Sequence, residues 1–150
     1  MAENQGVAST PQQHLIYFAD PMCSWCWGFS TVIDNILHSF SGRLSVRLVM
    51  GGRRPGESEP LSEVDKARTR LHWQQVEAAS GQTFNFDFFQ RNAFVNNTEP
   101  ACRAVVAARR LVPEKAISMM KALQMAFYLS LIHISEPTRR YAISYAVFCL

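Results

Sequence analysis

The stretch DPMCSWCWGF, residues 20–29, decides the fold, because it places two cysteines at the junction of two predicted elements. Residues 15–18 form a short apolar run after a polar lead, a pattern typical of a buried strand. Over residues 29–40 apolar side chains recur at steps of three and four, which predicts an amphipathic helix that the Ser-Gly pair at 41–42 ends. The cysteines therefore lie between a strand and a helix.

The elements after this helix complete an α/β pattern. Residues 44–50 alternate apolar and polar side chains, which predicts a second strand. Strand, helix and strand make a βαβ unit if the two strands are parallel. After a loop rich in Gly and Pro, three helices are predicted: residues 61–79 with Pro60 near the first turn, residues 98–111, and a helix that begins at Pro113. The predicted fold class is a βαβ unit followed by a helical block.

The spacing of the two cysteines suits redox chemistry. Cys23 falls at a helix start, where unpaired backbone N–H groups favour a thiolate, and Cys26 lies one turn further on. In such a pair the first thiolate attacks a disulfide and the second thiol resolves the mixed disulfide. We expect both residues to be catalytic.

Two other interpretations of the pair stay open. A CxxC is also half of a zinc site, but zinc takes four ligands, and His38, His72 and Cys102 stand alone in the sequence. Two buried, inert cysteines are the second alternative. We expect no metal, because the position after a strand in a βαβ unit favours the redox interpretation.

Composition limits the class of protein. The chain has 150 residues, of which 48% are hydrophobic and 18% charged, typical of one globular domain. Its 15 Lys and Arg residues occur in scattered pairs against 12 Asp and Glu, so no nucleic-acid partner is expected. The sequence contains no uncharged apolar stretch of about 18 residues, the length needed to span a membrane. Residues 1–13 carry no basic start or long apolar region, so we expect a disordered lead and a cytoplasmic protein.

The end of the chain does not look like natural protein. LSLIHISEPTR (residues 129–139) and ISYAVFCL (residues 143–150) resemble the translation of a sequencing-library adapter. We therefore expect residues 129–150 to be a non-native tail, and give His133 and Cys149 no functional weight.

Four segments carry a resemblance to a known family. They are YFADPMCSWCWGF (17–29), RLVMGGRRPG (47–56), HWQQVEAASGQTFNFDFF (72–89) and NNTEPACRAVVAARRL (96–111). Together they resemble the DsbA-like thiol–disulfide oxidoreductases, in particular the cytoplasmic members without a signal. The resemblance implies a thioredoxin-like βαβ domain over residues 14–56 with an inserted helical domain over residues 57–128. It also implies that Cys23 is the nucleophile and Cys26 the resolving thiol.

The sequence departs from that family at its end. Family members continue into a strand preceded by a cis-proline that faces the cysteines, whereas Pro100 and Pro113 lie at predicted helix starts. We therefore expect the C-terminal half of the sheet to be missing and this chain to be an inactive fragment, because two parallel strands cannot bury both faces.

The predicted function is thiol–disulfide exchange on protein or small-molecule substrates, with no cofactor beyond the redox-active disulfide and with glutathione as a possible co-substrate. We expect substrate contacts from Trp25, Trp27, Pro21 and Met22, with core packing as the alternative for the tryptophans. Two functions remain as alternatives. One is a glutathione-dependent isomerase or transferase of the kappa-type branch, whose members usually have serine at the first cysteine; the other is a non-catalytic metal- or protein-binding module.

Three further features can be explained either by a functional role or by an ordinary structural one. The Arg53-Arg54 pair either binds an anion such as glutathione or belongs to a solvated loop. The phenylalanines of residues 84–89 are expected to pack in a core rather than line a groove. His72 is expected to be a surface or hydrogen-bonded histidine. The oligomeric state is not predicted.

Overall fold

The computed structural model describes residues 13–130, in which two strands and five α-helices follow one another. The strands are β1 (Gln13–Ala19) and β2 (Leu44–Met50), and the helices are α1 (Ser24–Gly28), α2 (Ser30–Ser39), α3 (Glu63–Ser80), α4 (Glu99–Leu111) and α5 (Ala116–Tyr128). Two 3-10 turns, η1 (Phe86–Gln90) and η2 (Pro113–Lys115), precede α4 and α5. The predictions for residues 1–12 and for the adapter-like tail from residue 131 onward lie outside the described residues. None of the described helices is long and apolar enough to cross a lipid bilayer.

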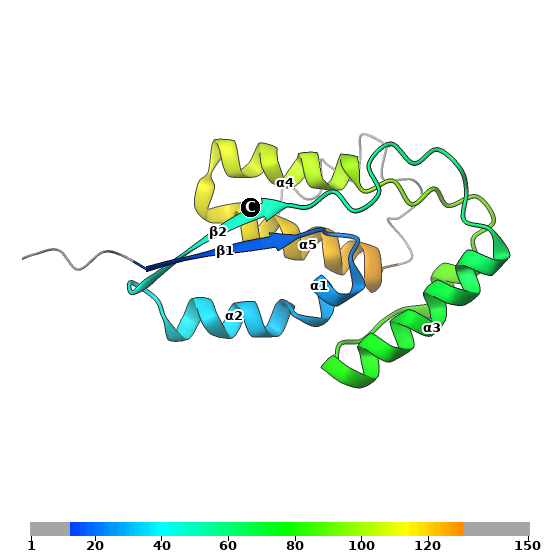
Figure 1. Ribbon diagram of the computed structural model, residues 1–150, viewed down its shortest axis with the longest axis horizontal. Helices are drawn as coiled ribbons and strands as arrows, with labels where there is room; N and C mark the ends of the chain where they lie inside the picture. Colours follow the sequence, from blue (N-terminus) through cyan, green and yellow to red (C-terminus); the bar gives the residue numbers. More distant parts are fainter. Residues whose placement is uncertain (1–12, 131–150) are drawn as a thin grey trace, which may run out of the picture.

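The two strands form a parallel sheet, which confirms the predicted βαβ unit. Gln13 pairs with Leu44 at one end and Ala19 with Met50 at the other (Figure 1). Side chains alternate between the two faces because the period of a strand is two residues. The face that carries Ala19 and Leu48 packs on α4 and α5, whereas Phe18 on the opposite face is 69% exposed.

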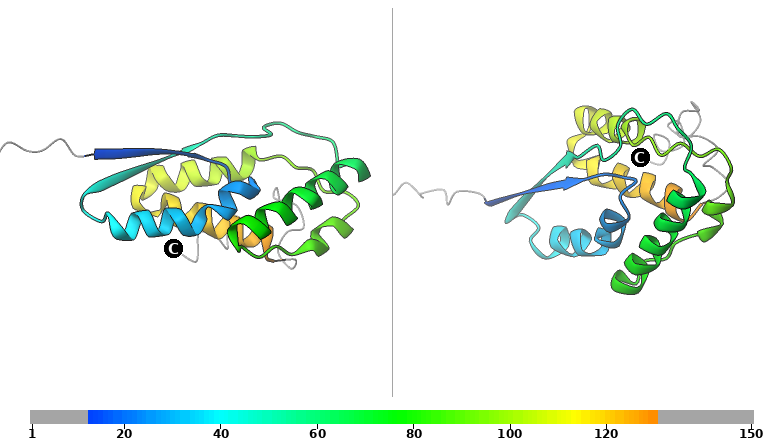
Figure 2. Two further views of the ribbon diagram at one scale, coloured as in Figure 1. Left: turned by 60° about the horizontal axis from the view of Figure 1, so that its bottom comes forward. Right: turned by 45° about the vertical axis from the view of Figure 1, so that its right-hand side comes forward.

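The helices α4 and α5 form the base on which the sheet rests. Both views of Figure 2 show them side by side. Small and flexible apolar side chains fill the contact: Ala104, Val105, Ala108, Ala116, Met119 and Met120 are buried together with the strand residues. Met119 and Met120 suit this contact because their flexible side chains fill irregular gaps in a core.

The helix predicted over residues 29–40 is observed as α2, and the separate short helix α1 precedes it and meets it at Phe29. Gly28 is the last residue of α1. A Cβ atom there would stand 2.8 Å from Val76 Cγ1, so only glycine lets α1 approach α3 this closely.

A second, aromatic core lies where α1, α3, η1 and α5 meet. The ring of Trp73 is 4.9–5.1 Å from the rings of Phe84, Phe88, Phe89 and Tyr128, in tilted or edge-on arrangements. Such pairs add roughly 0.5–1.5 kcal/mol each beyond the area that they bury. Phe84, Phe88 and Phe89 are buried and Phe86 packs against them, so the prediction that these phenylalanines form a core is confirmed.

The start of α3 differs from the prediction. Ser62 is the N-cap and its hydroxyl accepts the N–H of Asp65 at 3.1 Å, so the helix begins at Glu63 instead of residue 61. Pro60 is not in its first turn but pairs with Val95 in an isolated antiparallel bridge. Pro100 and Pro113 lie in the first turns of α4 and η2, and no peptide bond within residues 13–130 is cis.

Candidate redox site

The backbone between β1 and α1 brings the two cysteines to one end of the sheet. Cys23 is the N-cap of α1 in an extended conformation, and its N–H donates to the carbonyl of Asp20 at 3.1 Å. Cys26 follows within α1 and packs against the core between the sheet and helices α4 and α5. Both thiols are partly buried and free, so the pair is in its reduced form.

The surroundings of Cys23 favour its thiolate. The thiol of Cys26 donates a hydrogen bond to the Cys23 sulfur, and this contact is the largest cause that lowers the Cys23 pKa, to about 6. The backbone N–H of Cys26, the positive charge of Arg53 and the backbone N–H of Trp25 act in the same direction. Partial burial opposes them but is outweighed. At neutral pH Cys23 is therefore mainly a thiolate.

Cys26 behaves in the opposite way. Its pKa is raised, first because its proton is held in the hydrogen bond to Cys23 and then because the thiol is partly buried. A backbone hydrogen bond from Asp20 lowers the Cys26 pKa in part, whereas the negative charges of Cys23 and Asp20 raise it further. The pair thus consists of one thiolate and one neutral thiol, which is the arrangement that the nucleophile and resolving roles require.

Asp20 is a site residue that the sequence analysis missed. Only 3% of the residue is exposed. Its Oδ1 accepts the N–H of Met22 at 2.8 Å, and its Oδ2 accepts the N–H of Arg53 at 2.7 Å and the thiol of Cys102 at 3.6 Å. An acidic residue at the end of a strand, immediately before Pro21, was the available signal.

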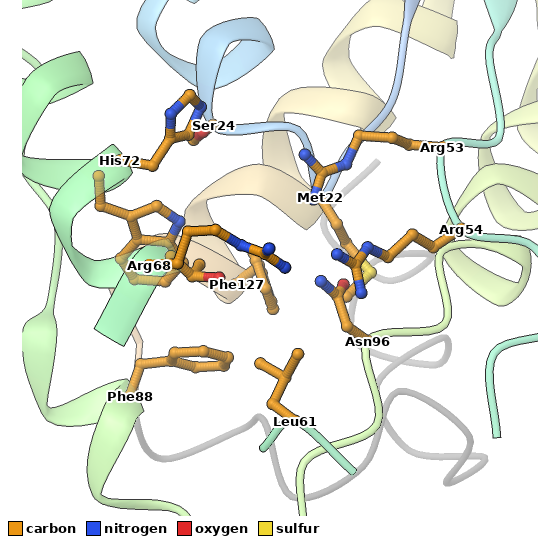
Figure 3. A pocket seen from close by; sticks show the side chains of 12 residues that line it. Met22, Ser24, Arg53, Arg54, Leu61, Arg68, His72, Phe88, Asn96 and Phe127 are labelled. Carbon is orange, nitrogen blue, oxygen red and sulfur yellow. The ribbon is translucent and has the colours of Figure 1, made fainter. Parts of the chain in front are cut away.

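A cavity of about 210 Å³ opens beside the Cys23 turn (Figure 3). In Figure 3 the guanidinium groups of Arg53, Arg54 and Arg68 face a common space, which Asn96 also faces. Asn96 is buried, and its Oδ1 has no hydrogen-bond partner within the described part of the chain. The remaining lining residues are Met22, Ser24, Leu61, Thr69, His72, Trp73, Phe88 and Phe127. The cavity combines three arginines, of which Arg54 pairs with Glu57 and Arg68 with Asp65, with an apolar wall and a free acceptor.

A second hollow lies on the Cys26 side and is mainly apolar. Its volume is about 530 Å³, and Trp25 and Cys26 line it together with Tyr17, Gly28, Phe29, Thr31, Val32, Ala79 and Ser80. Trp25 is 48% exposed, and its ring meets that of His72 edge-on at 6.1 Å. The cysteine pair is thus flanked by a positively charged cavity and an apolar one.

Two of the predicted substrate contacts, Trp27 and Pro21, are buried, and their contact with a substrate stays a prediction. Trp27 is only 4% exposed; its Nε1–H donates to the carbonyl of Thr83 at 3.1 Å and its ring stacks on Tyr128, so it belongs to the aromatic core. Pro21 is fully buried. Trp25 keeps an exposed face, and Met22 is buried but lines the charged cavity, so both remain available to a ligand.

Potential metal ligands do not gather within residues 13–130. Among residues 13–130, no group of three or more His, Cys, Asp and Glu side chains is arranged to hold a metal ion. Cys102 is buried at the Asp20 carboxylate, and burial raises its pKa to about 12.

A parallel βαβ unit with a reduced CxxC pair at the strand end, followed by packed helices, is consistent with a truncated thioredoxin-like fold. The solved structures that the chain is similar to agree with this class. A candidate protein disulfide isomerase from Nitrosomonas europaea is 36% identical, with a TM-score of 0.80, over 92% of this chain. The cytosolic disulfide reductase DsbM from Pseudomonas aeruginosa is 26% identical over 89% of this chain, with a TM-score of 0.71 for its structure with GSH and 0.72 for another.

These comparisons confirm the resemblance and the fold class that the sequence predicted. The chain spans 64% of the length of the Nitrosomonas protein and 62% of the length of DsbM. No family model matches the chain, and no curated protein matches it.

Proposed function

We propose that Cys23 and Cys26 are the reacting pair for thiol–disulfide exchange in the complete protein, of which the sequence predicts this chain to be an inactive fragment. The observation that supports the proposal most strongly is the asymmetry of the pair: a Cys23 thiolate with a pKa of about 6 that accepts a hydrogen bond from a neutral Cys26. A thiolate is the form that attacks disulfides, and a neutral neighbour cannot compete with it for the substrate.

The exchange runs in two balanced steps. The Cys23 thiolate attacks one sulfur of the substrate disulfide, that S–S bond breaks, and the leaving thiolate takes up a proton. Cys26 then loses its proton and attacks the Cys23 sulfur, which releases the second substrate thiol and forms the Cys23–Cys26 disulfide. The substrate disulfide gains two electrons and the dithiol loses them, so a thiol reductant must restore the pair.

We propose glutathione as that reductant and the cytoplasm as the compartment. Arg53, which acts on Cys23, lines a cavity with Arg54 and Arg68, and these guanidinium groups suit a small thiol that carries carboxylates. Arg54 and Arg68 also pair with Glu57 and Asp65. Asn96 Oδ1 offers an acceptor for an amide N–H of such a peptide. A low Cys23 pKa stabilises the dithiol form, which makes the disulfide easy to reduce. The similar DsbM is a cytosolic disulfide reductase and has been solved with GSH.

A trapping experiment tests this function. In a Cys149→Ser background, Cys26→Ser and Cys23→Ser variants are mixed with oxidised glutathione and weighed as intact chains by mass spectrometry. Cys26→Ser should form one stable mixed disulfide, mapped to Cys23, because the resolving thiol is gone; Cys23→Ser should form far less. Equal labelling of both variants would contradict the assigned roles.

The same variants address the kappa-type alternative. Members of that branch use glutathione without a cysteine pair, so glutathione-dependent turnover that survives Cys23→Ser would favour a transferase or isomerase. The exchange mechanism predicts that this variant is inactive.

A further inference from the structure

Asp20 is a buried carboxylate on which three separate segments converge. One donor comes from the Cys23 turn (Met22 N–H, 2.8 Å), one from the loop after β2 (Arg53 N–H, 2.7 Å) and one from α4 (Cys102 thiol, 3.6 Å). Burying a carboxylate is costly unless its oxygens accept hydrogen bonds, and here each oxygen does. The exchange steps described above assign this residue no part.

The geometry joins the reacting cysteine to the charge that acts on it. Asp20 holds the Cys23 turn twice, through its side chain at Met22 and through its carbonyl, which accepts the Cys23 N–H at 3.1 Å. Its second carboxylate oxygen holds the backbone of Arg53. The Arg53 side chain then lines the cavity beside that turn.

We infer that Asp20 is a positioning residue of the redox site: its carboxylate fixes the Arg53 loop against the Cys23 turn and so keeps the Arg53 charge near the sulfur. This inference rests on the proposed function in taking Cys23 as the reacting group. It goes further by assigning a role to a residue that touches no substrate.

Other charged or titratable groups also surround the cysteine pair. Cys26 of α1, Tyr17 of β1 and Tyr128 of α5 interact with Cys23 electrostatically, and His72 of α3 lines the same cavity as Arg53. Burial raises the pKa of both tyrosines, so both stay neutral near pH 7. The charge of Asp20 helps to keep the proton on Cys26. Arg53 is therefore the positive group through which a displaced loop would act on Cys23.

The sign of one substitution separates positioning from a simple charge effect. If Asp20 acted only as a negative charge, Asp20→Asn would lower the Cys23 pKa, because a nearby anion disfavours a thiolate. If Asp20 positions Arg53, the same change raises it, because the amide cannot accept both backbone N–H groups. We expect a rise of roughly half to one unit, since a nearby opposite charge shifts a pKa by about 1–3 units and is only displaced here.

The measurement is the rate of Cys23 alkylation by iodoacetamide as a function of pH, in the reduced 150-residue chain with Cys149→Ser. The midpoint of this rate profile gives the Cys23 pKa. Asp20→Glu keeps the charge but moves the carboxylate by one methylene, so it should raise the midpoint too, and it carries the test if Asp20→Asn does not fold. In an Arg53→Gln background, Asp20→Asn should change the midpoint little, because Asp20 acts on Cys23 through Arg53. Thr98→Val is the matched control: Thr98 is buried and its hydroxyl accepts the N–H of Arg54 at 3.0 Å, so its loss should lower stability and leave the midpoint unchanged.

The outcomes are distinct. A midpoint that falls or stays in the Asp20 variants, or shifts that add fully in the Arg53→Gln background, would overturn the positioning role and leave the proposed function standing. An ordinary Cys23 pKa in the parent chain would overturn the proposed function, and the inference with it.

Discussion

Removing the thiol of Cys26 should raise the pKa of Cys23, because the hydrogen bond from Cys26 is the largest cause of the low value. A hydrogen bond to a charged group is worth roughly 1.5–3 kcal/mol, and 1.36 kcal/mol corresponds to one pKa unit. In Cys26→Ala the Cys23 pKa should therefore move from about 6 to about 7.5, with a range of about 7–8. The backbone N–H groups and Arg53 remain in this variant, so the pKa stays below the ordinary value of about 9.

The rate at one pH is a weak measure of this change. At pH 6.5 the thiolate fraction falls from about three quarters to about one tenth when the pKa rises from about 6 to about 7.5, a loss of about eightfold. A thiolate of higher pKa is also more nucleophilic, with a Brønsted slope of about 0.4–0.5, which restores about four- to sixfold. The rate at pH 6.5 thus falls only about twofold, whereas the plateau above pH 9 rises about four- to sixfold.

The assay is alkylation by iodoacetamide from pH 4 to pH 10 in a Cys149→Ser background, read as the midpoint of the rate profile. The buried Cys102 has a pKa of about 12 and stays protonated over most of this range. Cys26→Ser is the matched control, because its hydroxyl can still donate to Cys23, so its midpoint should lie between those of the parent and Cys26→Ala. A midpoint that stays near 6 in Cys26→Ala would contradict a dominant role of the Cys26 hydrogen bond and leave the backbone N–H groups and Arg53 as the cause of the low pKa.

Three further predictions concern the scaffold and its pH dependence. Gly28→Ala should lower the free energy of unfolding in urea by about 1–3 kcal/mol, because its Cβ would overlap a side chain of α3; Gly51→Ala, whose Cβ would stand 3.6 Å from its nearest neighbour, should change it little. Trp27→Phe removes the hydrogen bond to Thr83 and should cost about 0.5–1.5 kcal/mol of stability while Cys23 alkylation is unchanged; altered alkylation would restore Trp27 as a site residue. The folded pKa of Cys23 lies below its ordinary value, so its stabilisation is complete above pH 9 and lost as pH falls through about 6. Unfolding of the reduced chain, compared with Cys23→Ser, should therefore require more denaturant at pH 8 than at pH 6, and equal midpoints would contradict the low pKa.

Local sequence patterns predicted the elements that carry the site. The apolar run at residues 15–18 and the alternation at residues 44–50 became the two parallel strands, and the CxxC pair lies where β1 meets α1. These features depend on periodicity and spacing within a few residues, which the sequence displays directly. The prediction failed at the start of α3, where Leu61 fits the apolar period of the helix but packs in the aromatic core, and Ser62 caps the helix.

The rest of the site depends on contacts between distant segments. Asp20 gains its role from Arg53 and Cys102, which lie 33 and 82 positions away in the chain. Trp27 is buried because it bonds to the Thr83 carbonyl and stacks on Tyr128. Trp25, two residues earlier in the sequence, is half exposed. No local pattern carries such information, since tertiary packing decides which side of a short helix is covered.

The proposed redox site requires Cys23 and Cys26 to form one redox pair. The direct measurement is equilibration of the reduced chain in mixtures of reduced and oxidised glutathione, followed by acid quenching, digestion and mapping of the disulfides. We expect a single Cys23–Cys26 disulfide to appear and disappear reversibly with the glutathione ratio, while Cys102 stays reduced because it is buried at Asp20. If Cys23 and Cys26 never pair, or if Cys102 is oxidised in step with them, the proposed redox site is wrong.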